Sequence, residues 1–101
     1  MTAPQSIQSK AQWWSMLDAA RRRTNEMLAF DPDRVMLKVI LAQLDFMGAC
    51  TREGRSPTDE ESDRITVGAI AVKNLDQEDA EYAGWLSELA YAFRKTWSSL
   101  P

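Results

Sequence analysis

Histidine is absent from this 101-residue chain, and cysteine occurs only once, at Cys50. Histidine is the commonest general base, and zinc sites are built mostly from histidine and cysteine, so neither a usual catalytic base nor a usual zinc ligand set is present. A single cysteine also excludes an intramolecular disulfide, which suits a reducing compartment. The sequence contains no glycine-rich phosphate loop and no nucleophile elbow. We therefore predict a binding protein that is not an enzyme and that holds no metal or cofactor.

Long apolar runs and an excess of positive charge are absent as well. No run approaches the roughly 20 residues that a membrane span requires, and no charged-then-apolar signal sequence opens the chain. The net charge is −3, whereas a nucleic-acid-binding domain usually has a basic balance. The one basic cluster, Arg21-Arg22-Arg23, points in three directions on a helix and is interpreted as a solvated surface. We expect a cytoplasmic protein that binds neither a membrane nor nucleic acid.

Apolar residues make up 45% of the chain, which is enough to fill one core. The length fits a single domain, assigned here to residues 1–101 with residues 1–5 as a flexible leader. Apolar residues recur at spacings of three and four, as they do on one face of a helix. The four helices expected on this basis are one that ends near Phe30 and three that span about 31–52, 58–74 and 77–98. Short loops between them predict an all-α, single-domain antiparallel bundle of about four helices.

Residues that favour helix N-termini mark where these helices are expected to begin. Ser6 or Ser9 precedes the first helix, and Asp31 precedes the second. Thr58 is followed three residues later by a glutamate, which is the spacing of a capping box, and it is expected to start the third helix. Asp76 is expected to start the fourth.

The same spacing predicts which side chains fill the core. Trp14 lies beside the stripe of the first helix, where it is either packed against a neighbouring helix or partly exposed as a partner-binding candidate. Cys50 is expected to pack as a small hydrophobe. The expected core positions of the four helices are Trp13, Leu17, Ala20, Thr24 and Met27 or Leu28; Met36, Val39, Ile40, Gln43, Leu44 and Met47; Ile65, Gly68, Ile70, Val72 and Leu75; and Tyr82, Leu86, Leu89, Phe93 and Trp97.

Residues 64–76 form the most apolar stretch in the second half of the chain. Its β-branched residues favour a buried strand when they are considered locally. The capping signal before the stretch and the helical spacing of Ile65, Gly68 and Val72 favour a helix instead. Glycine in a helix interior costs about 1 kcal/mol relative to alanine. Close approach of another helix therefore best explains Gly68.

Acidic residues gather on both sides of this stretch, and two interpretations of them stay open. In the first turns of helices they oppose the helix dipole, which stabilises a helix by about 0.3–1 kcal/mol per charge. As one negative rim they would attract a basic cleft on a partner and speed its capture. The clusters are Asp59, Glu60, Glu61 and Asp63 before the stretch, and Asp76, Glu78, Asp79 and Glu81 after it.

The stretch 64–76, Arg-Ile-Thr-Val-Gly-Ala-Ile-Ala-Val-Lys-Asn-Leu-Asp, resembles a run in a family of small bacterial immunity proteins. In that family a basic residue precedes an apolar-Thr-apolar-Gly sequence, followed by small-Ile-Ala-Val-Lys and then by an apolar-Asp pair. The pair Gln43-Leu44 and the segment 75–79 are also similar to the family's pattern. The first helix, with its tryptophan pair and its three arginines, has no counterpart in that pattern.

Members of that family neutralise a type VI secretion effector that hydrolyses NAD(P). The resemblance implies a helical protein without chemistry of its own, which binds a co-encoded toxin domain one to one and covers its active-site cleft. The alternatives are inhibition of a different nucleotide-targeting toxin, or a helical adaptor or self-associating bundle. The residues that the charge pattern and the resemblance together suggest for toxin binding are Asp76, Glu78, Asp79, Glu81 and Tyr82, followed by Asp59, Glu60 and Asp63.

Overall fold

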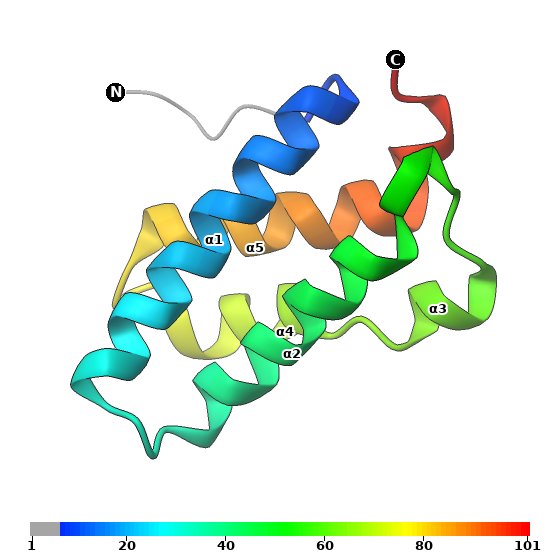
Figure 1. Ribbon diagram of the computed structural model, residues 1–101. Coiled ribbons are helices and arrows are strands. Elements are labelled where there is room, and N and C mark those ends of the chain that lie inside the picture. Colours follow the sequence, from blue (N-terminus) through cyan, green and yellow to red (C-terminus); the bar gives the residue numbers. More distant parts are fainter. Residues whose placement is uncertain (1–6) are drawn as a thin grey trace.

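The computed structural model describes residues 7–101, and every regular element within that range is a helix (Figure 1). The predicted all-α fold is therefore confirmed. Ser6 and the leader assigned to residues 1–5 lie outside the described residues. The α-helices are α1 (Lys10–Phe30), α2 (Val35–Cys50), α3 (Asp59–Asp63), α4 (Val67–Ile70) and α5 (Ala80–Tyr91). The wider π-helical segments Ala71–Leu75 and Ala92–Thr96 extend α4 and α5, and single 3-10 turns occupy Arg52–Gly54 and Trp97–Ser99.

Helices α1 and α2 form an antiparallel pair, and α4 and α5 pack against one side of it (Figure 1). The core lies between these two layers. Trp13 of α1 contacts two aromatic residues of the last helix, with its ring centroid 6.1 Å from that of Phe93 and 5.4 Å from that of Trp97. The backbone N–H of Lys10 donates to the carbonyl oxygen of Pro101 at 2.9 Å. The start of α1 is thereby joined to the end of the chain.

Helix α1 begins and packs as the sequence predicts. The Ser9 hydroxyl accepts a hydrogen bond from the backbone N–H of Gln12 at 3.1 Å, so Ser9 is the N-cap. The expected stripe of α1 is buried as far as Thr24, whose hydroxyl donates to the carbonyl oxygen of Ala20 at 2.7 Å. Trp14 is 37% exposed, so of the two outcomes left open for it partial exposure is the one observed.

Helix α2 begins three residues later than predicted, at Val35, because its N-cap is Arg34 and not Asp31. Asp31 caps the C-terminus of α1, where its N–H donates to the carbonyl oxygen of Met27 at 3.0 Å. The N–H of Arg34 then donates to the carbonyl oxygen of Asp31 at 3.2 Å, which closes a turn before α2 starts. The buried face of α2 is also rotated, because Leu37 is fully buried whereas Val39 is 40% exposed.

The prediction of one helix over 58–74 is wrong. The helix is interrupted after α3 ends at Asp63 and before α4 begins at Val67. The capping box at the start of α3 is confirmed: the Thr58 N–H donates to Glu61 Oε1 at 2.9 Å and the Glu61 N–H donates to Thr58 Oγ1 at 3.1 Å. After the break, Gln43 Oε1 of α2 accepts hydrogen bonds from the N–H groups of Thr66 (2.8 Å) and Val67 (2.9 Å). This side chain replaces the intrahelical carbonyl partners that a continuous helix would have supplied.

The break changes which residues of the central stretch face the core. Val67, Ala71 and Leu75, at steps of four, are fully buried, because the wider π-helical turn keeps a spacing of four on one face. Leu75 was expected in the core and is there, but the expectation for Val72 is wrong, since its side chain is 68% exposed. A Cβ atom at Gly68 would lie 3.2 Å from that of Ala90, so α4 does approach α5 closely at this glycine.

Of the other core predictions in this stretch, Ile65 is buried and Ile70 is partly buried against the core. Cys50, expected to pack as a small hydrophobe, is also buried. The stripe of the last helix is confirmed in full, since all of its members are buried: Tyr82, Leu86, Leu89, Phe93 and Trp97.

Candidate functional site

The acidic segment 76–81 connects the π-helical end of α4 to the start of α5, and its carboxylates have different environments. Asp76 is exposed, and no described basic side chain makes an ion pair with it. Glu78 accepts two hydrogen bonds from the guanidinium of Arg34, at 3.3 and 3.2 Å. Asp79 accepts from the N–H of Tyr82 at 3.1 Å, so Asp79 is the N-cap of α5 and the expectation that Asp76 caps this helix is wrong.

Arg23 of α1 connects this segment to the first helix. Its guanidinium bonds to both Asp79 and Glu81, the latter at 3.1 Å, and its Cζ lies 4.9 Å from the ring centroid of Trp85. The side chain of Arg23 is only 29% exposed. The interpretation of the three arginines as one solvated surface is therefore wrong for Arg23, which holds the segment against α1.

Tyr82 was expected to contact the toxin, but its side chain has no exposed surface. Its hydroxyl bonds to the Thr24 hydroxyl. Because Thr24 uses its only proton on the carbonyl oxygen of Ala20, the phenol is the donor in this pair. Burial raises the pKa of the Tyr82 phenol, so it stays protonated. Tyr82 belongs to the core, and we remove it from the surface proposed for toxin binding.

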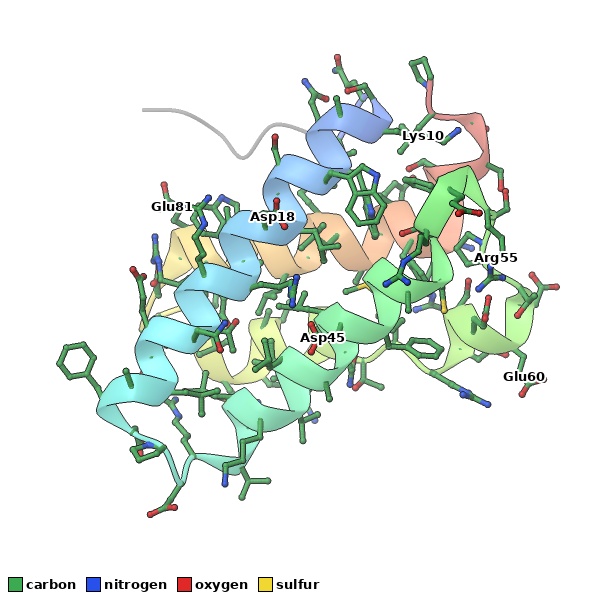
Figure 2. All side chains as sticks on the ribbon, in the orientation of Figure 1. Lys10, Asp18, Asp45, Arg55, Glu60 and Glu81 are labelled. Carbon is green, nitrogen blue, oxygen red and sulfur yellow. The ribbon has the colours of Figure 1, made fainter. Side chains whose placement is uncertain are left out.

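The acidic residues of α3 do not join the segment 76–81 in one rim. Figure 2 places Glu60 of α3 and Glu81 of α5 at opposite sides of the molecule. Glu60 makes an exposed ion pair with Arg64 at 3.1 Å, whereas Asp59 and Asp63 are exposed without an ion pair among the described residues. The single negative rim is therefore replaced by two separate acidic surfaces.

Glu61, which belongs to neither surface, ties α3 to the preceding loop. Its carboxylate accepts two hydrogen bonds from Arg55, at 3.1 and 3.0 Å, in addition to that from Thr58. The Arg55 guanidinium and the Thr58 N–H lower the pKa of Glu61 from 4.5 to about 2. Burial, together with this carboxylate, raises the pKa of the neighbouring Cys50 thiol, which is therefore not poised as a nucleophile.

The depressed pKa of Glu61 predicts how stability changes in acid. A carboxyl group whose pKa is lower in the folded protein stabilises it above the unfolded pKa, and this contribution is lost as the pH falls. The loss is expected between pH 4.5 and about 2, through the two pKa values of Glu61. Urea midpoints of the wild type and of Glu61→Gln, measured at about pH 7 and about pH 3, should converge in acid. An equal difference at both pH values would contradict this assignment.

A groove of about 340 Å³ lies between α1 and α2 beside the exposed edge of Trp14. Gly48 lines it, and a Cβ atom there would lie 3.4 Å from Leu17 Cδ2. Arg21 and Asp45 form an ion pair at 2.9 Å among its lining residues. The groove therefore offers both charge signs and no net field.

Within residues 7–101 the structure offers neither a metal site nor a membrane-spanning helix. No group of three or more histidine, cysteine or acidic side chains is placed to hold a metal ion in this range. No helix of the described chain is both long and apolar enough to cross a bilayer. What the described surface offers is therefore separate acidic surfaces, the groove at Trp14 and scattered exposed apolar side chains.

Comparison with protein families supplies what the geometry does not. The model of the Tsi6 family matches residues 13–95, a range that contains all of the proposed toxin-binding residues. The chain belongs to the Tsi6 family. Tsi6 is the type VI secretion immunity protein that neutralises the NAD(P)+ glycohydrolase effector Tse6. The comparisons with curated proteins and with solved structures gave no match.

Membership of the Tsi6 family confirms the resemblance noted in residues 64–76 and gives the chain its activity. It is an immunity protein against the Tse6 NADase toxin, which it binds, and it is not an enzyme. In the structure, the similar segments contact each other, because Gln43 of the Gln-Leu pair caps the backbone at Thr66 and Val67. What the sequence could not reveal are Arg23 and Arg34, which hold the acidic segment from distant parts of the chain.

Proposed function

We propose that this Tsi6 protein neutralises its toxin by covering the active-site cleft in a one-to-one complex, in the cytoplasm where NAD(P) is consumed. The observation that carries the proposal is the acidic segment 76–81, and above all the exposed carboxylate of Asp76, which makes no ion pair within residues 7–101. A cleft that holds the pyrophosphate of NAD(P) must offer positive charge or backbone N–H groups. A carboxylate placed there would occupy the same groups and exclude the substrate.

We favour the segment 76–81 over the acidic surface of α3 as the toxin-binding surface because the side chains of this segment are held in place. Asp79 caps α5, and Arg23 and Arg34 anchor the carboxylates beside it. A segment that is already ordered loses less conformational entropy when it binds. The surface with Asp59, Glu60 and Asp63 belongs to a helix of five residues, and we keep it as the second candidate.

Reversal of one charge on each surface separates the two candidates. Asp76→Lys is expected to weaken toxin binding by about tenfold, because the lysine would face the basic groups of the cleft. Asp63→Lys is the matched control, since both aspartates end a helical segment, where lysine is well tolerated. Calorimetric titration of the toxin domain with each variant measures the effect. Weakening by Asp63→Lys alone would move the interface to α3.

The proposal as a whole is tested by NAD hydrolysis. The toxin domain encoded beside this gene should lose turnover at stoichiometric immunity protein, with an end point at equal molar amounts. A raised concentration of NAD should delay inhibition, because the substrate and the protein would compete for one cleft. Tight binding that leaves hydrolysis intact would contradict the covering of the cleft.

A further inference from the structure

The turn between α1 and α2 is bounded by two exposed large hydrophobic residues, one of which has the highest exposed fraction of this class in the described chain. Phe30, the last residue of α1, is 93% exposed, and Val35, the first residue of α2, is 68% exposed. Single exposed hydrophobic residues are normal, but an almost fully exposed phenylalanine in a turn that also ends at an exposed valine is unusual for a solvated corner. The fold gives Phe30 no packing role, which leaves its ring available to a partner.

The turn lies beside the acidic segment proposed to face the toxin. Arg34 closes the turn through its N–H, which donates to Asp31, and its guanidinium holds Glu78 with two hydrogen bonds. This ion pair brings the turn 30–35 and the segment 76–81 together, and we call these two segments the α1–α2 corner. Asp31 and Asp33 are exposed on it, and neither makes an ion pair within residues 7–101.

We propose that Phe30 is the apolar anchor of the toxin interface, and this inference rests on the proposed covering of the cleft. A site that binds a dinucleotide presents flat apolar surfaces for its rings next to polar groups for its pyrophosphate. The α1–α2 corner offers the same pairing, because Phe30 is followed in the turn by two exposed aspartates, Asp31 and Asp33. Phe30 fills a ring-binding part of the cleft, while the carboxylates take the charged part.

The other exposed aromatic residues of the described chain do not fit such a cleft. Trp14 borders the groove whose arginines and aspartates cancel in charge. Tyr91 is 60% exposed, but exposed basic residues, Arg94 and Lys95, follow it at helical spacing. A basic cleft would repel them. Among the exposed aromatic residues within 7–101, Phe30 is the one that combines high exposure with two exposed aspartates in the same turn. A ring with few rotatable bonds also binds at low entropic cost.

Phe30→Ala tests this inference with Tyr91→Ala as the matched control. Both changes remove an exposed aromatic ring, so both variants should unfold at the same temperature as the wild type. Phe30→Ala is expected to weaken binding of the toxin domain by at least about 30-fold, which is the range of an interface hot spot. Tyr91→Ala is expected to leave the dissociation constant unchanged. An unchanged constant for Phe30→Ala, or an equal loss for both variants, would overturn the proposal.

Two variants together distinguish failure of the Phe30 anchor from failure of the proposed covering of the cleft. If Asp76→Lys weakens binding and Phe30→Ala does not, the acidic surface stands and the anchor is rejected. Sedimentation of the free protein tests the other occupant of the corner, a second copy of this chain. A homodimer that dissociates on Phe30→Ala, with toxin affinity unaltered, would overturn the assignment to the toxin.

Discussion

Replacement of Tyr82 by alanine is expected to lower the free energy of unfolding by about 3–5 kcal/mol, which is the usual effect of removing a buried aromatic side chain. Tyr82 is fully buried, and its hydroxyl donates to Thr24 across the contact between α1 and α5. Alanine would leave a cavity there and remove the hydrogen bond. Urea unfolding followed by far-UV circular dichroism measures the change, and a variant as stable as the wild type would show that the ring is not in the core.

Tyr82→Phe separates the ring from its hydroxyl. The ring remains, so the expected loss falls to about 1 kcal/mol, the contribution of one hydrogen bond. Because the side chain is buried, this variant should bind the toxin as tightly as the wild type does. A large loss of affinity for a stably folded Tyr82→Phe protein would restore Tyr82 to the interface.

Tyr82 illustrates how much of the candidate site the sequence could predict. The spacing of Tyr82, Leu86 and Leu89 predicts a buried stripe, and the structure confirms it. Its position directly after an acidic run also made it a candidate surface anchor. Helical periodicity indicates which side chains lie on the same face of a helix. It is therefore stronger evidence for burial than a position next to charged residues in the sequence is for exposure. The acidic neighbours Glu78 and Glu81 are exposed because they lie on other faces of the turn than Tyr82 does.

Two helix starts were predicted correctly, and two were placed too early in the chain. Ser9 and Thr58 cap through groups within three residues, and both predictions are confirmed. Asp31 and Asp76 are equally good caps by composition, yet each lies at the end of a preceding helix. Both turns are also joined to each other by a tertiary contact, the hydrogen bonds of Arg34 to Glu78, which is 44 residues away in the chain. No local pattern reports such a pair.

The exposed charges that carry the proposed function were identified from composition, but their arrangement was not. The two acidic clusters are close in sequence, but they stand at opposite ends of the segment 64–75, and the break before α4 turns α3 out of line with α4. A continuous helix over 58–74 would have placed α3 in line with α4. The fold therefore depends on the point where the chain turns, at Thr66 and Val67.

Gln43→Leu tests that turn, and it is expected to lower the free energy of unfolding by about 2–3 kcal/mol. The amide oxygen of Gln43 accepts from two backbone N–H groups, and its Nε2 donates to Thr66 Oγ1 at 2.7 Å. Leucine keeps the helix propensity of α2 but leaves these groups without a protein partner, at about 1–3 kcal/mol for each one that is shielded from water. Val67 is fully buried, so its N–H is the more costly of the two.

Gln43→Glu is the matched control, because a carboxylate still accepts both hydrogen bonds and lacks only the donor to Thr66. Its negative charge at the start of α4 also opposes the helix dipole. At neutral pH this variant should keep most of the wild-type stability, whereas Gln43→Leu should also increase hydrogen exchange at Val67 and in the following turn. Equal destabilisation of both variants would show that α2 packing, and not the capping of α4, gives Gln43 its effect. If the capping is the cause, the loosened α4 displaces Asp76, and Gln43→Leu weakens toxin binding although Gln43 lies outside the α1–α2 corner.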